Sequence, residues 1–197
     1  MTEIVLVRHG ETDSNIRGTY LGWTDVPLNE TGLSQAGIAR EKLLNEDFDI
    51  CISSPLKRAL DTARIIVKGK ELDILTDERL KERNFGVWDD LTYDEIVNSF
   101  PEEHKKWLED LNNYEVKDGE SFSGSYNRIV GFVDYLVMKH RGKKILVVTH
   151  SGCIRKFLAY LTGMGIDGVW HFKVDNAKIN RIEINDEGYA YISSLNA

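Results

Sequence analysis

The chain has 197 residues, a formal net charge of −7, 42% hydrophobic residues and 29% charged residues. This composition suits one compact domain with a buried core and excludes an intrinsically disordered protein. No apolar run approaches the ~18 residues that span a membrane, so we expect no membrane partner. The acidic balance argues against nucleic-acid binding, which depends on many cations that neutralise phosphates.

The start of the chain and its two cysteines indicate a cytoplasmic protein. The apolar run at residues 4–7 follows the initiator without a cationic leader, which predicts a core strand rather than a signal peptide. Cys51 and Cys153 lie within or beside apolar segments. Without an export signal, we expect two buried free thiols rather than a disulfide.

Apolar runs alternate with helical periods along the chain. In chain order we first expect a strand at 4–7, then a helix capped by Thr31 with Leu33, Ala36, Ala39 and Leu43 inward, a strand at 48–52 and a helix with Pro55 in its first turn. A weaker strand at 72–75, a helix at 126–140, a strand at 145–148, a helix from 154 and a hairpin at 178–184 and 189–193 are expected to follow. This order predicts an α/β fold of three layers: a mostly parallel central sheet flanked by helices, with an antiparallel hairpin at its C-terminal edge.

The stretch from about 88 to 123 is polar and aromatic and contains no strong strand pattern. We expect a small helical cap there, within a single domain over residues 1–197.

The first and last core strands end in the same way. Each runs from apolar residues into a histidine, His9 or His150, with a glycine at or just beyond it. Ligands of α/β sheets bind outside the carboxyl ends of parallel strands, so both imidazoles meet in one crevice if these strands are neighbours. Arg58, near the start of the helix after the middle strand, adds a cation and free backbone donors that favour an anion.

Together with Arg8, these residues form a set of two histidines and two arginines at the ends of strands. Buried cations are costly without a partner, so the set predicts a bound anion, and we expect it to be phosphate.

The run from Leu6 to Thr12, Leu-Val-Arg-His-Gly-Glu-Thr, resembles the signature of the histidine phosphatase superfamily, which has the phosphoglycerate-mutase-like fold. The likeness continues in the family's order through Asn15, residues 22–28, Thr31-Gly32, residues 53–59, Thr62-Ala63, Leu80-Lys-Glu82, Phe85-Gly86, Gly119-Glu-Ser121 and residues 148–152.

The resemblance implies a role for each matching residue. His9 is the expected nucleophile, Glu82 the expected proton donor, and His150 a second catalytic histidine. Phosphate is expected to bind to Arg8, Asn15, Arg58 and His150. The residues that we expect to contact the rest of the substrate are Tyr20, Leu21, Gly22, Arg83 and Ser151. For Arg83, two roles stay open: binding a substrate carboxylate, or an ion pair on the surface.

This assignment describes covalent catalysis in two steps without a metal or other cofactor. An unprotonated imidazole attacks phosphorus, the arginines stabilise the equatorial oxygens, and a carboxyl group protonates the leaving alkoxide. His150 and Cys153 are three residues apart, as in some metal sites, but we favour a thiol that packs in the core.

Three functions remain open. The first is a metal-independent phosphatase that acts on a small phosphorylated metabolite. The second is a phosphoglycerate mutase, which we disfavour because only 36 residues separate Glu82 from Gly119, whereas mutases carry a long insertion there. The third is a non-catalytic phosphate-binding scaffold protein, which we would expect to lack His9, Glu82 or His150.

With this short segment between Glu82 and Gly119, the chain resembles alpha-ribazole phosphatases and broad-specificity phosphatases. Alpha-ribazole 5′-phosphate is therefore one candidate substrate. Asp90 departs from those groups, which usually carry glycine there. The sequence leaves the physiological substrate and the oligomeric state open.

Overall fold

A six-stranded sheet forms the centre of the structure, a computed structural model that describes residues 1–197. The strands lie in the order β3-β2-β4-β1-β5-β6. Strands β1 to β4 are parallel to one another, while β5 and β6 run antiparallel as a hairpin at one edge. The strand bounds are β1 Thr2–Arg8, β2 Ile50–Ser53, β3 Ile74–Thr76, β4 Lys144–Thr149, β5 Ile179–Ile184 and β6 Ala190–Ser194.

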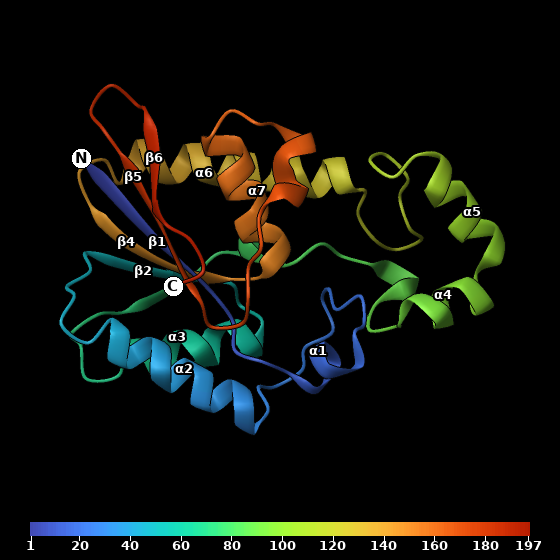
Figure 1. The fold of residues 1–197 in the computed structure, drawn as a ribbon, viewed down its shortest axis with the longest axis horizontal. Helices are drawn as coiled ribbons and strands as arrows, with labels where there is room; N and C mark the ends of the chain where they lie inside the picture. Colours follow the sequence, from blue (N-terminus) through green and yellow to red (C-terminus); the bar gives the residue numbers. More distant parts are fainter.

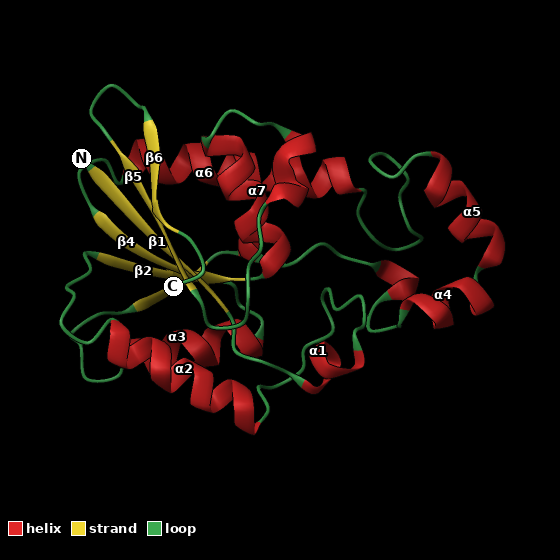
Figure 2. Cartoon of the chain, in the orientation of Figure 1, coloured by secondary structure: helices red, strands yellow, loops and turns green.

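Helices cover both faces of the sheet, which gives three layers (Figures 1 and 2). The α-helices are α1 Asp13–Arg17, α2 Glu30–Lys42, α3 Lys57–Val67, α4 Tyr93–Ser99, α5 Pro101–Glu109, α6 Phe122–Lys139 and α7 Ser151–Leu161; short 3₁₀ helices span Glu78–Leu80, Gly86–Trp88 and Ile166–His171. One hydrophobic cluster joins the sheet to α6 and α7, and a second joins it to α2 and α3. The predicted α/β class, with its C-terminal hairpin, is confirmed.

The central strands β1 and β4 bring their carboxyl ends to the same place. Their register pairs Val7 with Val148 and Arg8 with Thr149, and the backbone N–H of His9 donates to the carbonyl of Thr149 at 2.9 Å. The chain then leaves β1 toward α2 on one face and leaves β4 directly into α7 on the other (Figure 1). A crevice therefore opens between these two strand ends, as expected at such a switch point.

Two expectations about helix starts are wrong. Helix α2 begins at Glu30 with Asn29 as its cap, not Thr31, and Leu33 is 49% exposed. Gly32 takes the inward position instead, because the backbone of Glu11 approaches it too closely for any side chain. Pro55 lies outside α3, which begins at Lys57.

The stretch between residues 88 and 123 carries α4 and α5, which lie apart from the sheet (Figure 1). A small cluster of its own holds it together, centred on Trp88, Ile96 and Val116. The division into a single domain with a cap at 88–123 stays a prediction. None of the helices combines the length and the apolar character needed to cross a bilayer.

We predict that Gly32→Ala destabilises the protein. A Cβ at Gly32 would lie 2.1 Å from the backbone oxygen of Glu11, so the loop after His9 must move. We expect the free energy of unfolding to fall by about 1–3 kcal/mol in urea titrations.

Gly37→Ala is the matched control, since it lies on the same helix with no atom within 4 Å of an added Cβ. It should stabilise α2 by about 0.5–1 kcal/mol. Equal effects of the two substitutions would show that the contact between Gly32 and Glu11 imposes no constraint.

Candidate active site

Two buried histidines face each other at the ends of β1 and β4. His9 is 4% exposed and His150 is 1% exposed, and their ring centroids lie 5.2 Å apart in an edge-to-face arrangement. Each follows its strand directly, and His150 also forms the N-cap of α7. The structure therefore brings together two residues that are 141 positions apart along the chain.

The hydrogen bonds of His9 determine which nitrogen carries its proton. Nδ1 lies 2.7 Å from the carbonyl oxygen of Gly10. A carbonyl only accepts, so Nδ1 donates, and Nε2 of the neutral ring keeps its lone pair. Burial, followed by the charges of Arg58 and Arg8, lowers the pKa of His9 well below its usual value. His9 is thus a neutral imidazole with a free nucleophilic nitrogen.

His150 has a free ring nitrogen as well. Its Nε2 lies 2.8 Å from the hydroxyl of Ser54, and its buried Nδ1 has no protein partner. When the Ser54 hydroxyl donates to Nε2, Nδ1 carries the proton and is free to donate to a ligand oxygen. Burial, and after it the charge of Arg58, lowers the pKa of His150 well below its usual value.

Two arginines surround the histidines without any carboxylate partner. The Arg8 guanidinium donates to the carbonyl of Val174 at 2.7 Å, and its buried Nε has no partner. Arg58 is fully buried, donates to the carbonyls of Gly22 and Thr24 at 2.6 and 2.9 Å, and also has a free Nε. Burial lowers the pKa of both side chains. Such a pair of unneutralised cations favours an anion between them.

The loop that holds Arg58 is itself clamped by Asp89. The Asp89 carboxylate accepts the backbone N–H groups of Gly22, Trp23 and Thr24 at 2.6 to 3.0 Å. Gly22, predicted to contact the substrate, does not border the cavity, and its backbone joins Asp89 to Arg58. The segment that carries α4 and α5 thereby supports the arginine from a distance.

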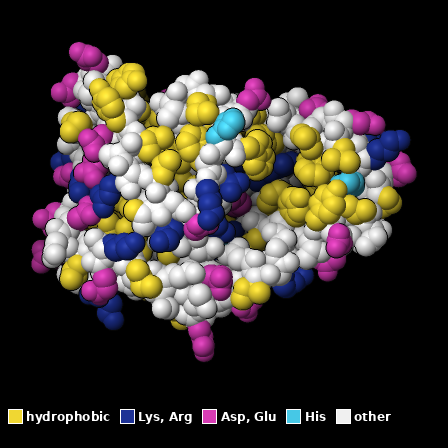
Figure 3. Space-filling view, viewed as in Figure 1, with side chains coloured by type: hydrophobic (Ala, Val, Ile, Leu, Met, Phe, Trp, Pro, Cys, Tyr) yellow, Lys and Arg dark blue, Asp and Glu magenta, His cyan; other side chains and the backbone are white.

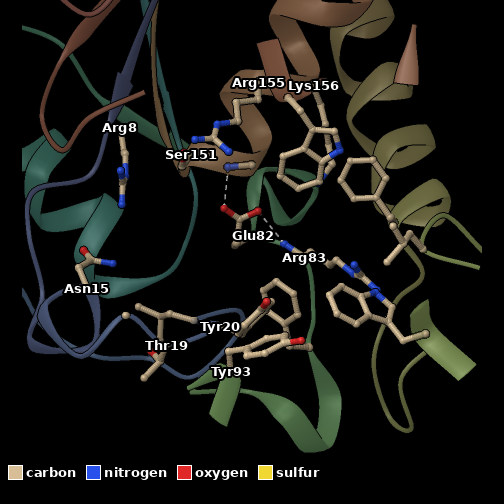
Figure 4. A pocket seen from close by; sticks show the side chains of 18 of the residues that line it. Arg8, Asn15, Thr19, Tyr20, Glu82, Arg83, Tyr93, Ser151, Arg155 and Lys156 are labelled. Atoms are coloured by element: carbon tan, nitrogen blue, oxygen red, sulfur yellow. Dashed lines mark hydrogen bonds between the residues drawn. The ribbon is translucent and has the colours of Figure 1, made fainter. Parts of the chain in front are cut away.

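Asn15 adds a donor at the same end. Its side-chain oxygen accepts from the N–H of Thr12 and from Asn176, which orients the amide. The amide nitrogen has no protein partner and points into the cavity (Figure 4).

Glu82 lies across the cavity, held by backbone groups. Its two carboxyl oxygens accept the N–H of Arg83 at 2.9 Å and the N–H of Gly152 at 2.8 Å. A Cβ at Gly152 would lie 2.4 Å from one of these oxygens, so any side chain there would displace the Glu82 carboxylate. The carbonyl of Glu82 also accepts from Arg128 and from the indole of Trp23.

These residues border a cavity of about 880 Å³ (Figure 4). Of the predicted site residues, its lining includes Arg8, His9, Asn15, Tyr20, Leu21, Glu82, Arg83 and Ser151. Arg58 and His150 are buried behind the wall rather than part of it. Arg83 is 7% exposed and forms no ion pair, so the alternative of a surface ion pair is wrong.

Sequence reasoning missed several residues of this wall. They are Gly18, Thr19, Phe85, Tyr93, Leu111, Asn112, Phe122, Gly152, Arg155, Lys156 and Trp170. For Arg155 and Lys156 a signal was present, since each lies four positions after a residue of the His150 motif, and residues four apart share a helix face. The aromatic residues come from separate parts of the chain, with Tyr93 and Phe122 at the starts of α4 and α6 and Trp170 in a 3₁₀ helix, and carry no such signal. Figure 3 shows basic side chains at the centre of this face, with hydrophobic side chains beside them toward α5.

Asp90, the residue that departs from the expected glycine, has φ of 59°. This left-handed conformation explains why glycine suits the position. The Asp90 carboxylate accepts from the hydroxyl of Thr19 at 2.7 Å and pairs with Arg17. These contacts hold Thr19, a residue of the cavity wall, in place.

No three His, Cys, Asp or Glu side chains come together as a metal site. The Cys153 thiol donates to the carbonyl of Lys81 at 3.1 Å, and burial raises its pKa to about 12. Both cysteines are buried and unpaired, as expected.

We predict that Asp89→Ala weakens the binding of inorganic phosphate by about tenfold, or ~1.4 kcal/mol. Loss of the carboxylate frees the N–H groups of Gly22 and Thr24, and the loop no longer holds Arg58 in place. Isothermal titration calorimetry measures this directly. Asp94→Ala, an exposed carboxylate close by with no hydrogen bond, should bind phosphate like the wild type. Equal affinity in both variants would contradict the clamp.

We predict that the two histidines make the free protein less stable as the pH falls below about 6.5, the usual histidine value. Because their pKa values are lowered in the folded state, only the unfolded chain binds protons there. Each histidine then removes about 1.4 kcal/mol of unfolding free energy per pH unit, down to its folded pKa.

Urea titrations of the wild type and of a His9→Asn, His150→Asn double variant between pH 5 and 8.5 test this prediction. The free energy of unfolding of the variant should fall less on acidification than that of the wild type. Above pH 7.5, both should change with pH at the same rate. Parallel curves throughout would refute the neutral state of the pair.

Comparison with known proteins agrees with this geometry. Residues 4–196 match the family model of the histidine phosphatase superfamily, branch 1. Phosphoserine phosphatase 1 of Hydrogenobacter thermophilus is 33% identical over 94% of this chain and 88% of its own length. Adenosylcobalamin/alpha-ribazole phosphatase of Escherichia coli is 32% identical over 98% and 94%. The crystal structure of the alpha-ribazole phosphatase from Shigella flexneri superposes with a TM-score of 0.94 at 30% identity, covering 99% of this chain and 96% of that one. The predicted resemblance is confirmed: the chain belongs to the histidine phosphatase superfamily and is a phosphatase.

Proposed function

We propose that the protein hydrolyses a small phosphomonoester through a phosphohistidine formed on His9. One observation carries this proposal: His9, whose Nε2 is unprotonated, lies beside His150 and in the field of Arg8 and Arg58, and backbone carbonyls rather than carboxylates accept the hydrogen bonds of both arginines. Metal ions take no part in the proposed reaction.

In the first step, the Nε2 lone pair of His9 attacks phosphorus and the ester P–O bond breaks. Negative charge spreads over the equatorial oxygens, where Arg8, Arg58, Asn15 and the Nδ1–H of His150 donate hydrogen bonds. Glu82, in its protonated form, gives its proton to the departing alkoxide. The products are the alcohol and the phosphohistidine.

In the second step, water attacks the phosphohistidine and the P–N bond breaks. The Glu82 carboxylate, which lost its proton in the first step, accepts a proton from this water. Phosphate leaves, His9 regains its lone pair and Glu82 is protonated again, so the cycle closes.

Water rather than a second phosphate ester is the proposed acceptor. The segment between Glu82 and Gly119 holds one 3₁₀ turn and the short helices α4 and α5, and no arginine occurs between Arg83 and Arg128. The long insertion with paired arginines that is typical of mutases is therefore missing. The intact set of His9, Glu82 and His150 argues against a non-catalytic scaffold.

The candidate substrates are small phosphorylated metabolites, among them alpha-ribazole 5′-phosphate and phosphoserine, the compounds in the names of the relatives. Aromatic side chains along the cavity suit an organic leaving group. Two buried free cysteines agree with a reducing cytoplasm, where we place the enzyme.

We predict that His9→Ala lowers kcat for p-nitrophenyl phosphate by ~10³-fold or more and abolishes the phosphohistidine. Rapid quenching with radiolabelled substrate should trap an acid-labile, base-stable phosphoenzyme in the wild type only. EDTA should leave turnover unchanged. His140→Ala, at the end of α6, serves as the control and should retain activity.

Glu82→Gln should lower kcat by about 10²–10⁴-fold for alkyl phosphates and less for p-nitrophenyl phosphate, whose leaving group needs no proton. Wild-type turnover in His9→Ala, or loss of activity in EDTA with rescue by a divalent metal, would overturn the proposal.

A further inference from the structure

The cavity holds more positive charge than a phosphate monoester needs. Its lining includes Arg8, Arg83, Arg155 and Lys156 but a single carboxylate, Glu82, in a protein whose net charge is −7. Arg155 lies close enough to Arg8 to lower its pKa, after the larger effect of burial, so it belongs to the phosphate end. Arg83 and Lys156 remain as cations without an assigned role.

Lys156 is a buried lysine with no polar partner. It lies on α7, is 2% exposed, and forms neither a hydrogen bond nor an ion pair with the protein. Its Nζ lies 5.1 Å from the centroid of the Phe122 ring. A buried ammonium in this state costs several kcal/mol unless a ligand supplies the missing charge.

Arg83 borders the same part of the cavity and is also incompletely paired. Its Nε donates to the carbonyl of Glu120 at 2.9 Å, while one terminal nitrogen is buried without a partner. Its guanidinium lies 5.3 Å from the centroid of the Phe85 ring, and the side chain is directed away from the phosphate end (Figure 4).

The nearby carboxylates are already engaged elsewhere. Both oxygens of Glu82 accept backbone N–H groups. Both oxygens of Glu120 bind Arg128 at 2.7 Å, and one also accepts from the N–H of Asn84. Neither Arg83 nor Lys156 therefore forms an ion pair with a carboxylate, although the charge of Glu82 acts on both.

The pKa values of Arg83, Lys156 and Arg128 differ according to whether a carboxylate is hydrogen-bonded to the side chain. Burial lowers the pKa of Arg83, against the charges of Glu120 and Glu82, and it lowers the pKa of Lys156, against the charge of Glu82. For Arg128, burial acts in the same direction, but the hydrogen bonds to Glu120 together with nearby negative charges outweigh it and raise the pKa. Arg128, which pairs with a carboxylate, thus lies in the same region as Arg83 and Lys156, which form no such pair.

We propose that Arg83 and Lys156 bind a second anionic group of the substrate, a carboxylate or a second phosphate carried by the leaving group. The substrate is then a phosphomonoester of an acidic alcohol. This inference rests on the proposed phosphatase reaction at His9, and adds the chemical class of its leaving group. The aromatic walls formed by Tyr20 and Trp107 would contact the carbon skeleton between the two anions.

Matched pairs of substrates test the inference. O-phosphoserine and O-phosphoethanolamine differ by one carboxylate, and fructose 1,6-bisphosphate and fructose 6-phosphate differ by one phosphate. We expect the wild type to prefer the more anionic member of one pair by at least about tenfold in kcat/KM, the equivalent of one charge-assisted hydrogen bond. The preferred pair identifies the second anion.

The variants Lys156→Met and Arg83→Met should each reduce this preference toward unity. Arg155→Met should lower kcat/KM equally for both substrates of a pair, so the preference remains. Lys105→Met, an exposed lysine on α5, should keep both the preference and the activity. Thermal unfolding monitors folding of the variants, and the substrate ratio is an internal measure that does not depend on the amount of folded enzyme.

The outcomes separate the inference from the function on which it rests. If the wild type forms no phosphohistidine and releases no phosphate, the proposed function fails. If it hydrolyses p-nitrophenyl phosphate but prefers neither anionic member, or if both variants keep the preference, the second anion site is wrong and the phosphatase reaction stands.

Discussion

Burial of positive charge without a directly bound carboxylate is the constraint on which the site depends. Arg8 and Arg58 are buried beside two imidazoles, and backbone carbonyls rather than carboxylates accept their hydrogen bonds. Carbonyl oxygens orient a guanidinium but do not cancel its charge. Burial, and after it the positive field of these arginines, keeps His9 and His150 neutral. The same positive field attracts a dianion, so it contributes both to substrate binding and to the nucleophilic state of His9.

Close backbone contacts keep this arrangement in place. Gly10 and Gly32 let the loop after β1 pack directly on α2, and Gly152 lets the start of α7 reach Glu82. The N–H of Gly10 donates to the hydroxyl of Thr62, which in turn donates to the carbonyl of Arg58. The loop of the nucleophile, the helix start beside the proton donor and the phosphate-binding arginine are thus each held by contacts to main-chain atoms, which have little conformational freedom of their own.

The segment with α4 and α5 has two connections to the site. Through Asp89 it holds the loop of Gly22 and Thr24, and so the guanidinium of Arg58. Through Tyr93 and Trp107 it forms part of the wall that faces the leaving group. Variation in this segment therefore changes both the shape of the cavity and the support of the phosphate end.

The sequence alone determined the fold class, the strand ends at which the histidines lie, and the family, because these depend on local patterns. A buried parallel strand is recognisable from its own residues, and the motif residues follow it within two or three positions. Even the position of Lys156 had a local signal, its spacing from the His150 motif. Tertiary structure alone decided the rest: that Gly32 rather than Leu33 faces inward, that Asp89 supports Arg58, and that Lys156 has no hydrogen-bond or ion-pair partner. Each of these depends on which distant backbone or side chain comes into contact, and hydrophobic periodicity and local spacing carry no information about such contacts.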